Sequence, residues 1–176
     1  KNANTIYADT WFANLSKSTD GGATWSSLGL SADSGNSESL SIARGNTSWL
    51  LVVKGNGRVA RSTNGGTTWA DTLSVAGAVV TAVQFAPSDD NHAFAASANG
   101  RVWHTSDGGA TWTELPHTGL PAARVHDIEV DWTQPLRVYL GFGALGVRQL
   151  WRGEIDAANN ATWFDVSGAS PAVSLP

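Results

Sequence analysis

The 176-residue chain contains no cysteine, so disulfide bonds, thiolate metal ligands and cysteine nucleophiles are all excluded. Charged residues make up only 15% of the sequence, and the formal net charge is −4. Such a balance attracts neither nucleic acid nor an anionic membrane, so we expect neither as a partner. No apolar run approaches the ~18 residues that a membrane span requires, so we expect no span.

Methionine is also absent, and the sequence begins at Lys1 without a visible secretory leader. We therefore expect a processed product or a segment of a longer protein. Glycine (19 residues) and tryptophan (9 residues) are plentiful instead, which is typical of a turn-rich all-β protein.

One motif repeats at a fixed interval. The run Ser18-Thr19-Asp20-Gly21-Gly22-Ala23-Thr24-Trp25 returns, with small changes, at 62–69 and at 105–112. The tryptophans that close these copies lie 44 and then 43 residues apart. A period of this length indicates a repeat architecture.

The flanks of the motif repeat as well. Runs of alternating apolar and polar residues before and after each copy predict short β-strands. Asn56-Gly57 and Asn99-Gly100 separate two such runs, which predicts type I′ hairpin turns with positive φ at both residues. Each period then holds four antiparallel strands, and repeated four-stranded units of this size predict the blades of a β-propeller. We place the blades at about 1–30, 38–74, 78–116 and 123–168.

In the third repeat, residues 88–92 are expected to form the turn between the first two strands. The fourth repeat departs from the pattern. In the fourth, the third strand is expected over 146–152, and 153–163 replaces the motif, with Ala158 where the aspartate should stand. Only Thr162 and Trp163 of the motif survive there.

The first blade is expected to lack its innermost strand, because the sequence starts directly with a second strand over 5–10. The tail at 170–176 ends about where another first strand should begin. An unpaired sheet edge invites association with other chains. We therefore expect a segment of a larger ring, or a partial ring that closes by self-association.

The repeated motif resembles the Asp-box, or BNR repeat. That family includes sialidases, xyloglucan-type glycoside hydrolases built from two seven-bladed propellers, sortilin-type receptor ectodomains and a photosystem assembly factor. The resemblance implies that each box is a structural turn between the third and fourth strands of a blade, away from the usual active site, with its tryptophan wedged between blades. The residues given this structural role are Asp20, Gly22, Thr24, Trp25, Asn64, Gly66, Thr68, Trp69, Asp107, Gly109, Thr111, Trp112 and Trp163.

Function is therefore expected on the opposite face, where the repeats differ. Asp9 and Asp127 could supply the carboxylate pair of a glycoside hydrolase, but the sequence favours Asp9 as a turn residue and Asp127 as the cap of a strand edge. The four histidines lack metal-ligand spacing, so we expect no metal, and the sequence indicates no cofactor. The candidate ligand-binding residues are Trp11, Glu38, Lys54, His117, Arg124 and His126.

The sequence thus favours a propeller scaffold from a secreted or cell-envelope protein that presents a face to a protein or glycan ligand. The alternative is a fragment of a secreted glycoside hydrolase that acts on a polysaccharide. A third hypothesis is a partial propeller that assembles into a full ring.

Overall fold

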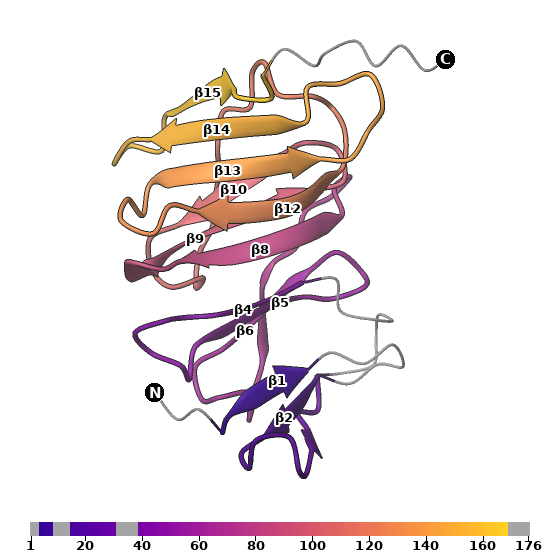
Figure 1. The fold of residues 1–176 in the computed structure, drawn as a ribbon, viewed down its shortest axis with the longest axis vertical. Helices are drawn as coiled ribbons and strands as arrows, with labels where there is room; N and C mark the ends of the chain where they lie inside the picture. The colour runs from indigo at the N-terminus through magenta and orange to yellow at the C-terminus, as the bar shows by residue number, and fades with distance from the viewer. Residues whose placement is uncertain (1–3, 9–14, 31–38, 169–176) are drawn as a thin grey trace.

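The computed structural model describes residues 4–8, 15–30 and 39–168, in which all regular structure is β-sheet (Figure 1). In this part of the chain no helix is present that could cross a membrane. The strands are β1 (Ile6–Ala8), β2 (Ser16–Ser18), β3 (Ser26–Ser27), β4 (Ser39–Ile42), β5 (Leu50–Val53), β6 (Val59–Ser62), β7 (Ala70–Leu73), β8 (Val80–Ala86), β9 (Asp89–Ser97), β10 (Val102–Thr105), β11 (Thr113–Glu114), β12 (Val125–Val130), β13 (Arg137–Phe142), β14 (Leu150–Ile155) and β15 (Ala161–Asp165).

These strands form four antiparallel sheets in chain order. The first has three strands, β1-β2-β3, and the others have four each, β4 to β7, β8 to β11 and β12 to β15. The first strands of neighbouring sheets, β4, β8 and β12, contact one another and form the inner edge of the stack. This is the arrangement of propeller blades, and it confirms an all-β propeller segment whose first blade has only three strands, with no inner one, among the described residues.

Apolar side chains from adjacent blades form the core. Leu51 of blade 2 and Phe85 of blade 3 belong to one buried cluster, and Phe94 of blade 3 and Leu140 of blade 4 belong to another. Because blade 3 is covered on both faces, β9 is buried continuously from Ala93 to Ser97. A strand buried on both faces does not show the alternation of buried and exposed side chains that a half-exposed strand shows.

The repeated motifs form the turns β2–β3, β6–β7 and β10–β11. In the third copy, Asp107 accepts a hydrogen bond from the Thr111 amide (2.9 Å) and another from its hydroxyl (2.6 Å). The Gly109 amide donates to the Thr105 hydroxyl (3.0 Å). In the second copy, Asn64 accepts from the corresponding amide at the same distance, 2.9 Å. An amide side chain therefore makes the same turn as a carboxylate.

The tryptophan of each later turn bonds to the preceding blade through its indole N–H. The pairs are Trp69 to the Leu28 carbonyl (3.2 Å), Trp112 to the Thr72 hydroxyl (3.2 Å) and Trp163 to the Pro116 carbonyl (2.7 Å). Trp25 instead donates to Gly22 of its own turn (3.0 Å) and is 45% exposed. These indoles link one blade to the next by hydrogen bonding as well as by packing.

The hairpin turns differ from the type I′ prediction. Gly57 and Gly100 have positive φ (75° and 82°), but Asn56 and Asn99 do not. The Gly57 amide instead donates to the Lys54 carbonyl (2.8 Å), so the turn is longer by one residue. Three-residue hairpin loops of this kind need positive φ only at the final glycine.

Two strand boundaries were also wrong. Strand β9 begins at Asp89 because Ala86 pairs with Asp89, which reduces the expected turn over 88–92 to Pro87 and Ser88. Strand β14 runs over Leu150–Ile155, later than the expected 146–152, because its register pairs Arg137 with Glu154.

The turn after β14 recovers the missing aspartate of the fourth repeat. Asp156 accepts hydrogen bonds from the amides of Ala158 and Asn160, each at 2.9 Å. Asn159 takes the positive φ (63°) that glycine supplies in the other copies. The aspartate of this turn is therefore Asp156, whereas the repeat pattern placed it two residues later, at Ala158.

Candidate functional site

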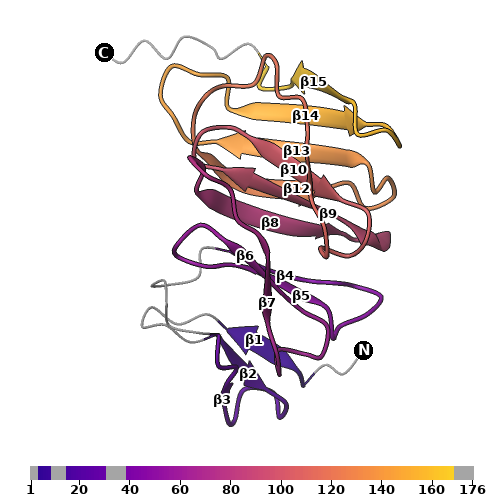
Figure 2. The ribbon, with the colours of Figure 1, turned by 180° about the vertical axis from the view of Figure 1, so that it is seen from behind.

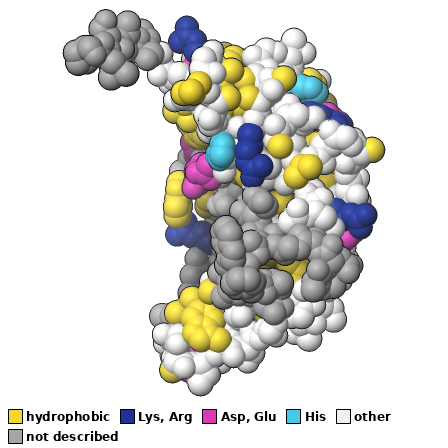
Figure 3. Space-filling view, turned by 90° about the vertical axis from the view of Figure 1, so that its right-hand side faces the viewer, with side chains coloured by type: hydrophobic (Ala, Val, Ile, Leu, Met, Phe, Trp, Pro, Cys, Tyr) yellow, Lys and Arg dark blue, Asp and Glu magenta, His cyan; other side chains and the backbone are white. Residues whose placement is uncertain are grey.

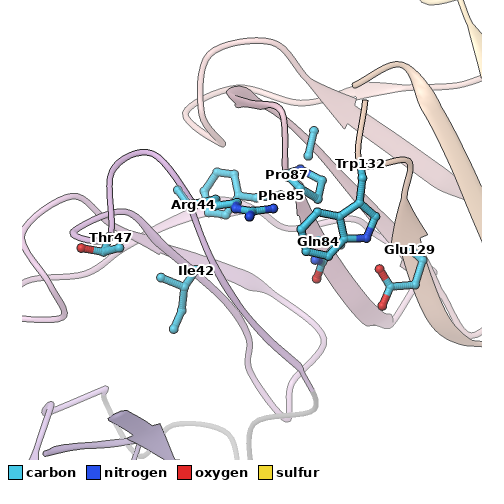
Figure 4. Close-up of a pocket in the computed structure, with 10 residues that line it drawn as sticks. Ile42, Arg44, Thr47, Gln84, Phe85, Pro87, Glu129 and Trp132 are labelled. Carbon is cyan, nitrogen blue, oxygen red and sulfur yellow. The ribbon is translucent and has the colours of Figure 1, made fainter. Parts of the chain in front are cut away.

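A cleft of about 500 Å³ opens where the inner strands β4, β8 and β12 end (Figure 4). We call it the inner-strand cleft. Its volume falls within the range of small-ligand sites, roughly 300–1,000 Å³. Its lining residues are Ile42, Ala43, Arg44, Thr47, Gln84, Phe85, Ala86, Pro87, Glu129 and Trp132.

Strand alternation explains why polar groups reach this cleft. In β12, Ile128 and Val130 are buried against blade 3, so Glu129 between them is exposed on the opposite side. Trp132 follows two residues after the strand. The loop that carries it is held by Asp131, which accepts hydrogen bonds from the amides of Thr133 (2.9 Å) and Gln134 (3.1 Å).

Trp132 is exposed to an extent that packing does not explain. Its side chain is 65% exposed, against 45% for Trp25. The Arg44 guanidinium lies over the indole, 4.4 Å from the ring centroid, although Arg44 belongs to blade 2 and Trp132 to blade 4. A solvated cation–π pair contributes only about 0.5–1 kcal/mol. An indole held this openly is therefore available to a ligand.

The cleft also offers unused polar groups. Within the described residues, the Glu129 carboxylate and the Gln84 amide make no hydrogen bond. The Arg44 guanidinium makes no hydrogen bond or ion pair there and lies over the indole. The cleft thus combines an aromatic surface with hydrogen-bond donors and acceptors.

Carboxyl groups near the turns are held in the ionised form. The Thr133 amide and hydroxyl lower the pKa of Asp131 beside the cleft. In the third box, burial raises the pKa of Asp107, but hydrogen bonds from Thr111 outweigh it and lower the value to about 2. Hydrogen bonds, chiefly from Thr24, lower the pKa of Asp20 to about 2 as well. A catalytic general acid needs a raised pKa, which is the opposite of the shift at these three carboxyl groups.

On the opposite face, the structure brings together three of the predicted residues. Arg124, His126 and Asp127 lie at the start of β12, where a bulge between Val125 and Asp127 leaves both His126 and Asp127 exposed. The Gly143 amide donates to the Arg124 carbonyl (3.4 Å). Figure 3 shows this face, with histidine, acidic and basic side chains side by side.

The remaining predicted residues are placed differently. Lys54 is buried, and its ammonium lies 2.6 Å from the Asp71 carboxylate, so it is engaged within blade 2. His117 is exposed in the connection from β11 to β12, with Nδ1 3.8 Å from Glu114. Asp9, Trp11 and Glu38 lie outside the described residues.

The sequence analysis missed Arg44, Gln84, Glu129 and Trp132. A signal was present for Trp132, because it stands outside the 43–44-residue period of the box tryptophans. The other three come from repeat positions that only folding brings to one cleft. As for metals, the described residues contain no group of three potential ligands.

No protein-family model and no curated protein matches the chain. Solved structures do match it. One is an ancestral GH74 enzyme, at a TM-score of 0.74 and 21% identity, covering 98% of this chain and 23% of that one. Another is the GH74 xyloglucanase from Xanthomonas campestris, at 0.60 and 18%, covering 80% of this chain and 20% of that one.

A third is YCF48 bound to D1 peptide, at a TM-score of 0.63 and 14% identity, covering 93% of this chain and 52% of that one. The chain thus spans about a fifth to a half of the length of these proteins. At such identities the likeness concerns the fold, which is that of a β-propeller segment.

Proposed function

We propose that the chain is a non-catalytic binding segment of a propeller, that it takes a glycan in the inner-strand cleft, and that its Asp-boxes serve only as structural turns. The observation that carries this proposal is the exposed indole of Trp132 beside unused polar groups. A sugar ring has an apolar C–H face that an indole can cover, and hydroxyls that need both donors and acceptors. Arg44 supplies donors, Glu129 supplies acceptors and Gln84 supplies both.

The cleft does not fit two-carboxylate hydrolysis. Of the residues that line it, only Glu129 carries a carboxylate, whereas most glycoside hydrolases use two at about 5–10 Å. The boxes do not fit catalysis either, because Asn64 replaces the aspartate of one box and keeps its hydrogen bond. These observations favour binding over turnover.

A printed array of plant and bacterial polysaccharides, with a second array of short peptides, tests the proposal. We expect glycan spots to retain the wild-type chain, Trp132→Ala to lose at least tenfold in affinity, and Trp132→Phe to regain part of it. Retention on peptide spots alone, with the same dependence on Trp132, would make the ligand a polypeptide. Retention that ignores Trp132 would reject the cleft.

The second candidate function is a fragment of a secreted glycoside hydrolase. Asp127 favours it, because this exposed carboxylate lies beside His126 on the face predicted to be functional. The test is release of reducing sugar from xyloglucan, a substrate named for one similar enzyme. Turnover that disappears in Asp127→Asn, with an unchanged circular dichroism spectrum, would support this second candidate against the first.

The proposal also includes self-association and a secreted or cell-envelope location. Self-association is supported by the exposed outer face of blade 1, where Ile6 is 38% and Trp25 is 45% exposed. Native mass spectrometry over a range of concentrations measures it, and a monomer throughout would contradict it.

A further inference from the structure

A second cavity lies beside the inner-strand cleft, between blades 1 and 2. We call it the Tyr7 groove. Its volume of about 330 Å³ lies within the range of small-ligand sites, roughly 300–1,000 Å³. Figure 2 shows blades 1 and 2 beside each other at one end of the stack, as Figure 1 does from the front. The lining residues are Thr5, Tyr7, Lys17, Ile42, Thr47, Ser48, Asn64 and Gly65.

Two residues line both the cleft and the groove. They are Ile42, which ends β4 and is 38% exposed, and Thr47, which is exposed in the loop from β4 to β5. The two cavities therefore adjoin each other across blade 2. One extended molecule can enter both of them.

Each cavity holds an aromatic ring with a cation over its face. In the groove, the Lys17 ammonium lies 5.4 Å from the centroid of the Tyr7 ring. In the cleft, the Arg44 guanidinium lies 4.4 Å from the Trp132 ring. Tyr7 and Lys17 stand directly opposite each other in β1 and β2, so both side chains lie on one face of blade 1. The groove thus repeats the pairing that is found in the cleft.

The groove also offers hydroxyl groups to a ligand. Several side-chain hydroxyls that line it make no hydrogen bond within the described part of the chain. They belong to Thr5, Tyr7, Thr47 and Ser48. The Lys17 ammonium adds a donor, which lies 3.5 Å from the Gly65 carbonyl. Because hydroxyls both donate and accept, these groups match the hydroxyls of a sugar.

The two rings are too far apart for one sugar to cover both. Tyr7 belongs to blade 1, whereas Trp132 lies against Arg44 of blade 2. Neighbouring sheets are spaced by about 10 Å, which is more than the width of a sugar ring. A ligand that uses both rings must therefore be a chain of sugars. Its second contact is then intramolecular, which raises affinity about 10²–10⁴-fold where the geometry permits both contacts.

We propose that the Tyr7 groove is a second glycan subsite, continuous with the inner-strand cleft, and that the ligand is a linear polysaccharide several sugars long. This site rests on the proposed glycan binding and specifies its ligand as a chain. Tyr7 covers the C–H face of one sugar, and the hydroxyls around it bond to that sugar. Ile42 and Thr47 contact the sugars between the two rings.

Isothermal titration calorimetry tests the proposal. The probes are cello-, xylo-, manno-, chito- and malto-oligosaccharides, from disaccharide to octasaccharide. In one of these series, we expect the octasaccharide to bind the wild type about a hundredfold more tightly than the disaccharide, which the cleft alone can hold.

Two matched variants separate the groove from the cleft. Ser48→Arg places a long side chain in the groove from an exposed position that does not line the cleft. It should remove most of the gain with length, while the disaccharide still binds. Ser106→Arg adds the same side chain at an exposed position in the third box, outside both cavities, and should bind like the wild type.

Tyr7→Ala gives a second reading, with circular dichroism as the check on folding. It should weaken octasaccharide binding about tenfold, and Tyr7→Phe, which keeps the ring, should lose less. Equal wild-type affinities for disaccharide and octasaccharide would overturn the groove subsite alone. A gain with length that persists in Ser48→Arg would overturn it as well. A wild-type chain that binds no member of any series would overturn both the subsite and the proposed glycan binding.

Discussion

Replacing Trp112 and Trp132 separately by alanine distinguishes a structural indole from a binding one. Trp112 packs on the cluster between blades 2 and 3 and donates to Thr72. A tryptophan covers about 150–250 Å² on burial, and Trp112 is mostly but not fully covered. At about 25 cal/mol per Å², reduced for residual burial in the unfolded chain, the packing loss is about 2–3 kcal/mol. The lost hydrogen bond adds about 1 kcal/mol.

We therefore expect Trp112→Ala to lower the free energy of unfolding by about 3 kcal/mol. Trp132, at 65% exposure, should cost under about 1 kcal/mol when replaced. Urea unfolding followed by far-ultraviolet circular dichroism measures both. Glycan retention should respond in the opposite order, with the larger loss for Trp132→Ala. Equal losses of stability, or a Trp112→Ala cost below about 1 kcal/mol, would refute the distinction.

Three further changes probe the box turns and the buried His104, whose Nδ1 lies 2.6 Å from the Asn159 side-chain oxygen. We expect Asp107→Asn to lower the free energy of unfolding by less than about 1 kcal/mol, because Asn64 makes the same hydrogen bond in the second copy. Asp107→Ala removes this bond and should lower the free energy of unfolding by about 1–2 kcal/mol. Urea unfolding measures both changes, and equal costs would contradict the reasoning. Burial lowers the pKa of His104, so its stabilising contribution is complete above pH 6.5 and decreases as pH falls below it. Urea midpoints should therefore fall with pH less steeply in His104→Gln, and identical slopes would argue against this. Gly109→Ala should lower the melting temperature more than Gly119→Ala, since both have positive φ but only Gly109 lacks room for Cβ.

Periodicity made much of the fold predictable. The spacing of the boxes and the alternation of their flanks gave the strand order, the four blades and the missing inner strand. The predicted boundaries of strands and turns were wrong where local hydrogen bonds differ from those that the repeat pattern predicts. Pro87 and Ser88 close β8–β9 early, and Asp156 supplies the carboxylate two residues before Ala158. Those choices depend on register, which a single strand does not specify.

The candidate site was less predictable than the fold. Arg44, Gln84 and Glu129 occupy ordinary positions in three different blades, and only their stacking brings them to one cleft. Lys54 shows the opposite case. It looked available in a turn, but Asp71 of the same blade holds its ammonium in an ion pair. Contacts between residues far apart in sequence decide both outcomes.

The most direct test of the account uses the tryptophan side chains as reporters. Nine indole N–H groups give nine side-chain signals in a nitrogen–proton correlation spectrum, assignable by single substitutions. On titration with the glycan that the array identifies, we expect the Trp132 signal to shift and those of Trp69, Trp112 and Trp163 to stay. Shifts confined to other indoles, with Trp132 unchanged at saturation, would contradict binding in the inner-strand cleft.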